Sequence, residues 1–136
     1  MQVEKEILVI DDNELMLNIL KTYLEHDGFK VQTCPSAVCA IALAKEHRFD
    51  VYIVDYRLPG MKGDAVTAAI RGMQPSAIII GYSVELKEQA FLSAGADKFI
   101  VKEKLSAEIS AFIRQRLAHV GCKCGHHADT CNSATR

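Results

Sequence analysis

The stretch VYIVD at residues 51–55 places four apolar residues directly before an acid. A short, continuous apolar run is typical of a strand that is buried on both faces, as in a parallel sheet. The turn-forming sequence LPGMKG follows at residues 58–63. The run ILVI at residues 7–10 ends in the same way, at Asp11 and Asp12. We therefore interpret both runs as buried strands whose carboxyl ends carry acids.

Strand and helix patterns alternate outward from these two runs. Shorter apolar runs predict three further strands, at residues 29–34, 77–80 and 98–101. Apolar residues at helical spacing, together with Ser36 and Ser106 as caps, predict helices over residues 14–25, 36–47, 64–71, 86–94 and 106–120. Strand and helix thus alternate five times, which predicts a doubly wound α/β fold with a five-stranded parallel sheet and helices on both faces.

Composition narrows the range of functions. The 136 residues are 49% hydrophobic and 24% charged, which fits one domain with a real core. The net charge of -1 excludes a broad basic surface for nucleic acid. The apolar runs are too short for a signal peptide or a membrane span, so we expect a cytoplasmic protein that contacts neither membrane nor nucleic acid.

Polar side chains gather where the predicted strands end. In a parallel sheet those ends share one edge, where ligands bind; the residues are Asp11, Asp12, Asp55, Ser83 and Lys102. Two carboxylates about 5 Å apart repel by roughly 3 kcal/mol at an effective dielectric near 20. We therefore expect Lys102 and a hard divalent cation, Mg²⁺, to compensate the acids. Singly, Asp12 also fits a helix cap and Asp55 a turn.

Four separated motifs together resemble the receiver domain of two-component response regulators. They are ILVIDDNE, VYIVDYRLPGMKG, IIIGYS and GADKFIVK, in that order, and the resemblance covers about residues 6–120. It implies a flavodoxin-like sheet with the strand order 2-1-3-4-5. Since no output domain fits in the remaining residues, we expect a stand-alone receiver at residues 1–120 and a flexible, polar tail at residues 121–136.

The resemblance implies a phosphoacceptor chemistry for the acids. Asp55 matches the aspartate that accepts a phosphoryl group from a phosphohistidine. Asp11 and Asp12 match the acidic pair that, with Asp55 and the backbone carbonyl of Arg57, holds Mg²⁺. An aspartate nucleophile next to a cation suits in-line phosphoryl transfer. Such a domain is a regulatory module, limited to its own phosphorylation and dephosphorylation, and not an enzyme.

Further residues match the parts that respond to phosphorylation. Lys102 and the Ser83 hydroxyl match contacts to the phosphoryl oxygens, and Phe99 matches the switch aromatic. Movement of Ser83 would favour an inward Phe99 and reshape the face formed by the fourth helix, fifth strand and fifth helix. The implied partners are a sensor histidine kinase or histidine phosphotransfer protein and a downstream protein target. We expect a monomer or a weak dimer.

Several positions depart from the family pattern. Glu103 follows Lys102 where many receivers carry Pro, and Val84 replaces a small residue after Ser83. Arg57 and Glu85 each lie two residues beyond a site residue. We expect them to pair across the entrance and to slow attack by water. The first helix has an apolar arc of about 200°, wider than a sheet alone requires, so either a partner helix docks on it or it is deeply buried.

The tail combines soft ligand types. A zinc site there is one hypothesis and a tail with free thiols the other; its candidate ligands are Cys122, Cys124, His126, His127 and Cys131. The odd number of cysteines, five, argues against a disulfide framework.

Three other functions remain as alternatives. An α/β phosphatase would need a second acid at position 13, which is Asn. A flavodoxin-like cofactor binder would need a phosphate loop rich in Ser, Thr or Gly after the first strand, where this chain is acidic. A degenerate receiver would bind proteins without being phosphorylated, and Val84 and Glu103 are compatible with it.

Overall fold

Five strands alternate with five helices in the computed structural model, which describes residues 5–102 and 105–121. The strands are β1 (Glu6–Ile10), β2 (Lys30–Cys34), β3 (Val51–Asp55), β4 (Ile78–Ser83) and β5 (Lys98–Val101). The helices are α1 (Glu14–His26), α2 (Ala37–Glu46), α3 (Gly63–Met73), α4 (Glu88–Ala94) and α5 (Leu105–Gly121). Within these residues, no helix is both long enough and apolar enough to span a membrane.

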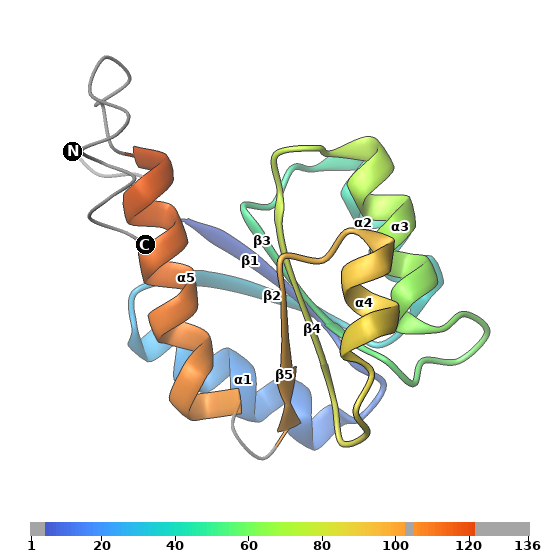
Figure 1. Ribbon diagram of the computed structural model, residues 1–136. Helices are drawn as coiled ribbons and strands as arrows, with labels where there is room; N and C mark the ends of the chain where they lie inside the picture. Colours follow the sequence, from blue (N-terminus) through green and yellow to red (C-terminus); the bar gives the residue numbers. More distant parts are fainter. Residues whose placement is uncertain (1–4, 103–104, 122–136) are drawn as a thin grey trace.

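The strands form one parallel sheet in the order β2-β1-β3-β4-β5 (Figure 1). This is the predicted doubly wound, flavodoxin-like topology. β1 and β3 are direct neighbours, and Ile10 at the end of β1 pairs with Val54. Asp11 and Asp55, the residues that follow this pair, therefore emerge side by side at the carboxyl edge of the sheet.

Helices cover both faces of the sheet (Figure 1). Alternate residues of each central strand point to opposite faces. Ile7, Val9 and Ile53 pack with the residues of α1 and α5. Leu8 and Val54 point to the other face, where they pack with residues of α2, α3 and α4. β3 is buried along its whole length, as its apolar run predicts.

The helix ends differ from the predicted ones in instructive ways. α4 begins at Glu88 rather than at Leu86, whose side chain is largely exposed. α3 continues past Gly72 to Met73, because glycine weakens a helix without ending it. α5 begins at Leu105, so Ser106 lies inside the helix and is not its cap, which corrects that prediction. At the predicted stop after α4, Gly95 does adopt a left-handed conformation with φ 111°.

Candidate functional site: an acidic cluster at the carboxyl edge

Three carboxylates converge at the carboxyl edge of the sheet. Asp11 and Asp12 follow β1, and Asp55 ends β3. One oxygen from each lies within 4.8 Å of the others. Asp11 and Asp55 are buried, whereas Asp12 is exposed. Oxygen ligands on one open edge suit a small hard cation that keeps several waters, so the donor set fits Mg²⁺.

Among the described residues, one amine lies against two of the three acids. Lys102 follows β5, and its Nζ lies 3.3 Å from Asp55 Oδ1 and 3.4 Å from Asp11 Oδ2. Its side chain is 20% exposed, so water screens this charge only in part. A single ammonium balances one of the three carboxylates, which leaves the edge with an excess of negative charge.

This excess alters the proton affinity of Asp55. Burial and, to a smaller extent, the negative charge of Asp11 raise the pKa of Asp55 from its ordinary 3.8 to about 6, although Lys102 opposes both effects. A second positive charge at this edge would favour the ionised carboxylate, which is the form that can act as a nucleophile.

The capping alternative for Asp12 is wrong. Asn13 is the N-cap of α1, and its side chain accepts a hydrogen bond from the amide of Met16. The amide of Asn13 in turn donates to Asp11 Oδ1 at 2.9 Å. Asp12 therefore has no capping role, and its exposed carboxylate stands at the mouth of the acidic cluster.

Ser83 and Phe99 lie on the neighbouring strands. Ser83 ends β4 and is buried; its Oγ accepts the amide of Glu85 at 3.0 Å, so its hydroxyl hydrogen can still be donated. Phe99 on β5 is half-buried and stacks on Phe91 of α4, with ring centroids 5.8 Å apart. A Cβ at Gly81 would lie 2.3 Å from the Phe91 ring, so this glycine makes room for the aromatic pair.

The loop after β3 contributes to the entrance of the site. Arg57 Nη2 lies 2.8 Å and 2.7 Å from the two carboxylate oxygens of Glu85, which confirms the predicted pairing. The loop is closed at its base, where the amide of Gly63 donates to the carbonyl of Tyr56 at 2.7 Å. A Cβ at Gly63 would lie 2.2 Å from the backbone oxygen of Asp55, so only glycine fits there. The loop is thus held against the strand that carries Asp55.

Sequence reasoning missed Tyr82. This residue lies one position before Ser83, and its fully buried hydroxyl donates to Asp11 Oδ2 at 2.5 Å. Burial, together with the charge of Asp11, raises the pKa of Tyr82 well above its usual value, so the hydroxyl stays protonated. The tyrosine that follows the apolar run IIIG at residues 78–81 was the available signal, since a buried tyrosine requires a partner for its hydroxyl.

The hypothesis of a zinc site falls outside the described residues. Its candidate ligands all lie in residues 122–136: Cys122, Cys124, His126, His127 and Cys131. Within residues 5–102 and 105–121, the acidic triad is the one group of metal-ligating side chains that converges, and nothing in that part of the chain supports zinc.

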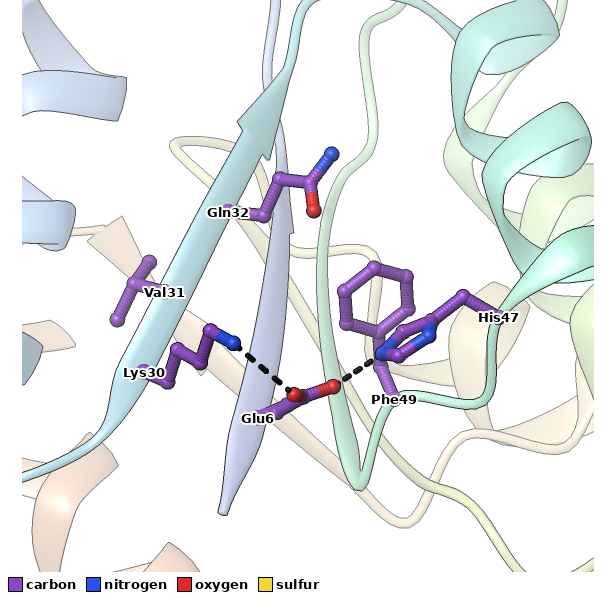
Figure 2. A pocket seen from close by; sticks show the side chains of 6 residues that line it. All are labelled: Glu6, Lys30, Val31, Gln32, His47 and Phe49. Atoms are coloured by element: carbon purple, nitrogen blue, oxygen red, sulfur yellow. Dashed lines mark hydrogen bonds and ion pairs between the residues drawn. The ribbon is translucent and has the colours of Figure 1, made fainter. Parts of the chain in front are cut away.

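A pocket of about 260 Å³ lies at the opposite, amino edge of the sheet. Figure 2 shows the Glu6 carboxylate between Lys30 of β2 and His47, which follows α2. Glu6 lies 3.6 Å from Lys30 and also accepts a hydrogen bond from His47. The acid of this pocket is therefore already paired with two basic groups, unlike the carboxylates at the carboxyl edge.

Comparisons with known proteins agree with this geometry. The transcriptional regulatory protein PrrA of Mycobacterium tuberculosis is 31% identical over 127 residues, which is 91% of this chain and 54% of PrrA. The chain thus spans about half the length of the curated relatives it matches.

Solved structures of response regulators are also similar to this chain. The response regulator TrrA of Thermotoga maritima, in complex with Mg²⁺–BeF, is 27% identical, with a TM-score of 0.77 over 82% of this chain and 97% of TrrA. A response regulator of Burkholderia pseudomallei, with a phosphorylated aspartic acid, calcium ion and citrate, is 26% identical, with a TM-score of 0.70 over 79% of this chain and 72% of that one. Residues 7–114 match the response regulator receiver domain, and the chain therefore belongs to that family.

Proposed function

We propose that this chain is a phosphoacceptor module of a two-component phosphorelay, in which Asp55 receives a phosphoryl group from a phosphohistidine. The observation that carries the proposal is the cluster of Asp11, Asp12 and Asp55, two of which, Asp11 and Asp55, pair with the amine of Lys102. Receiver domains partner with histidine kinases, which supports a sensor kinase or a histidine phosphotransfer protein as the donor. We place this exchange in the cytoplasm.

Each residue of the edge has a role in this proposal. Asp11, Asp12, Asp55 and the carbonyl of Arg57 would hold Mg²⁺, which when bound neutralises charge on the phosphoryl oxygens. Asp55 is the nucleophile, and Lys102, already 3.3 Å from it, supplies positive charge beside the transferred group. The Ser83 hydroxyl donates to a phosphoryl oxygen once the group is in place.

Phosphorylation would then be transmitted to the α4-β5-α5 face. The phosphoryl group adds about -1.5 to -2 charge, which draws the Ser83 hydroxyl and its loop toward Asp55. Phe99 packs on Phe91 of α4, so any movement of Phe99 changes the contact between β5 and α4. We propose that this face binds the downstream protein target.

The first helix offers a surface to the phosphodonor. Leu15, Ile19 and Tyr23 recur every four residues along α1, with exposed fractions of 67%, 49% and 36%. The alternative that α1 is deeply buried is therefore wrong on this side. The stripe starts three residues after Asp12, which favours a helical phosphotransfer partner that reaches Asp55. Ile19→Asp should slow transfer from such a partner but not from acetyl phosphate, and Val38→Asp on α2 is the matched control.

The experiment that tests the proposal is intact mass spectrometry after incubation with acetyl phosphate, with and without Mg²⁺. We expect a single phosphoryl adduct that requires Mg²⁺ and is absent from Asp55→Asn. The matched control is Asp64→Asn, which should form the adduct normally. Asp64 is an acid in the first turn of α3, and its side chain accepts a hydrogen bond from the amide of Ala65. If the wild type gives neither an adduct nor a stable beryllofluoride complex, the chain is the degenerate receiver that binds proteins without phosphorylation.

A further inference from the structure

A buried tyrosine connects β4 to the acidic cluster. Tyr82 is fully buried on the face of the sheet that packs with α1 and α5. Its hydroxyl donates to Asp11 Oδ2 at 2.5 Å, across 71 positions of sequence. Hydrogen bonds to a charged acceptor are short and strong, so this contact fixes where the carboxylate points.

Asp11 is held by donors from three parts of the chain. Its Oδ1 accepts the amide of Asn13, and its Oδ2 accepts both the hydroxyl of Tyr82 and the ammonium of Lys102. The hydroxyl is the closest of these donors, at 2.5 Å against 2.9 Å and 3.4 Å. The orientation of Asp11 therefore depends more on Tyr82 than on Lys102.

Tyr82 also contacts Lys102 directly. The ammonium lies 5.0 Å from the centre of the Tyr82 ring, which is within reach of a cation–π interaction. The same ammonium is nearly equidistant from Asp11 and Asp55, at 3.4 Å and 3.3 Å. Because the Tyr82 hydroxyl offsets part of the negative charge on Asp11 Oδ2, Lys102 is drawn less strongly to Asp11 and also remains beside Asp55.

We propose that Tyr82 is a positioning residue of the cation site: its hydroxyl orients Asp11 for Mg²⁺, and its ring and hydroxyl together keep Lys102 shared between Asp11 and Asp55. This inference rests on the proposed function and adds a residue to it. Groups that orient a metal ligand from behind typically change metal affinity by about 10- to 100-fold when they are removed. Tyr82→Phe keeps the ring and removes the hydroxyl alone.

The test is a titration with Mg²⁺ alone, followed by the NMR signals of the Asp12 and Asn13 amides. We expect the Kd of Tyr82→Phe for Mg²⁺ to be about tenfold higher than that of the wild type. Tyr52→Phe is the matched control, because it removes another buried tyrosine hydroxyl, from the amino edge, where Tyr52 donates to Gln74. It should lower the midpoint of urea unfolding and leave the Kd for Mg²⁺ unchanged.

A double-mutant cycle in EDTA supplies a second measurement, independent of the metal. Tyr82→Phe and Asp11→Ala should be non-additive in their effect on urea unfolding, because each removes the same hydrogen bond. Additive effects, or an unchanged Kd for Mg²⁺ in Tyr82→Phe, would overturn the role of Tyr82 and leave the proposed function intact. If the wild type shows no saturable response to Mg²⁺, the proposed function fails and the positioning role fails with it.

Discussion

The two edges of one sheet treat buried polar groups in opposite ways. At the amino edge, the Tyr52 hydroxyl donates to Gln74 Oε1 at 2.7 Å, and Gln74 Nε2 donates to the carbonyl of Ala44 at 2.9 Å. These groups are neutral, and each has its partner within the protein. The Glu6 carboxylate at the same edge is likewise paired, with Lys30 and His47.

At the carboxyl edge the balance is incomplete. Asp11 and Asp55 share the ammonium of Lys102, and Asp12 forms no ion pair with any residue that the structure describes. The described residues at this edge supply less positive than negative charge, which supports the cation that we propose for the site. The amino edge thus contributes to stability, whereas the incompletely paired acids of the carboxyl edge lower it at neutral pH.

The largest expected effect is the pH dependence that Asp55 imposes on the metal-free protein. Its pKa is about 6 in the folded protein against an ordinary 3.8, so its contribution to stability is fully present below about pH 4 and is lost as the pH rises through about 6. In EDTA, the free energy of unfolding of the wild type should fall relative to Asp55→Asn between about pH 3 and pH 7, by up to about 3 kcal/mol. Urea unfolding at several pH values measures it, and parallel curves for the two proteins would contradict it.

The next largest effect is on the stability that the amino edge contributes. Gln74→Ala removes the acceptor of the Tyr52 hydroxyl and the donor to the carbonyl of Ala44. Because buried polar groups without partners are costly, we expect the free energy of unfolding to fall by about 2 kcal/mol. Mg²⁺ affinity and the phosphoryl adduct should not change. A loss of Mg²⁺ affinity in this variant would remove the distinction between the two edges.

A smaller effect is expected at the entrance of the site. The ion pair between Arg57 and Glu85 is exposed and screened by water, so we expect its loss to change a rate by no more than about fivefold. Arg57→Ala and Glu85→Ala should each shorten the lifetime of the phosphoryl group by up to about that factor, because water gains access to it. Decay of the adduct in intact mass spectra measures this, and an unchanged lifetime in both variants would refute the idea.

The smallest effect concerns the Glu6 carboxylate. The hydrogen bond with His47 lowers the pKa of Glu6. The stability that the ionised Glu6 contributes is therefore present above its ordinary pKa and is lost as the pH falls through its lowered pKa in the folded protein. His47→Ala should raise the pKa of Glu6 toward 4.5, as followed by NMR of its side chain. Phosphorylation should be unaffected, and any change in it would link the two edges.

Much of the fold and of the acidic site could be predicted from the sequence, because local patterns determine the strands and the residues at their ends. The apolar runs at residues 7–10 and 51–54 identified the central strands, and the residues after them identified the acids. The pair of Arg57 and Glu85 could also be proposed, since each lies two residues beyond a residue at the same edge. The shift of the α4 start to Glu88 could not be predicted, because the apolar side chain of Leu86 points to solvent.

Contacts between distant strands were the part that sequence could not supply. Tyr82 and Asp11 are 71 positions apart, and periodicity identifies a buried position but not the partner of its hydroxyl. The same limit applied to Tyr52 and Gln74, which meet across 22 positions. Ser106 failed as a cap for a different reason, since Ser also occurs inside helices.

The close approach of Gly63 to Asp55 has a consequence for mutational libraries. In a library selected only for folding, Asp55 should be replaced freely, because a buried acid with a raised pKa costs stability. Gly63 should stay fixed in the same library, since any side chain there would collide with the strand backbone. In a library selected for signalling, both positions should be invariant. Sequencing the two populations side by side would therefore separate the residue proposed to perform the chemistry, Asp55, from the one that makes room for it, Gly63.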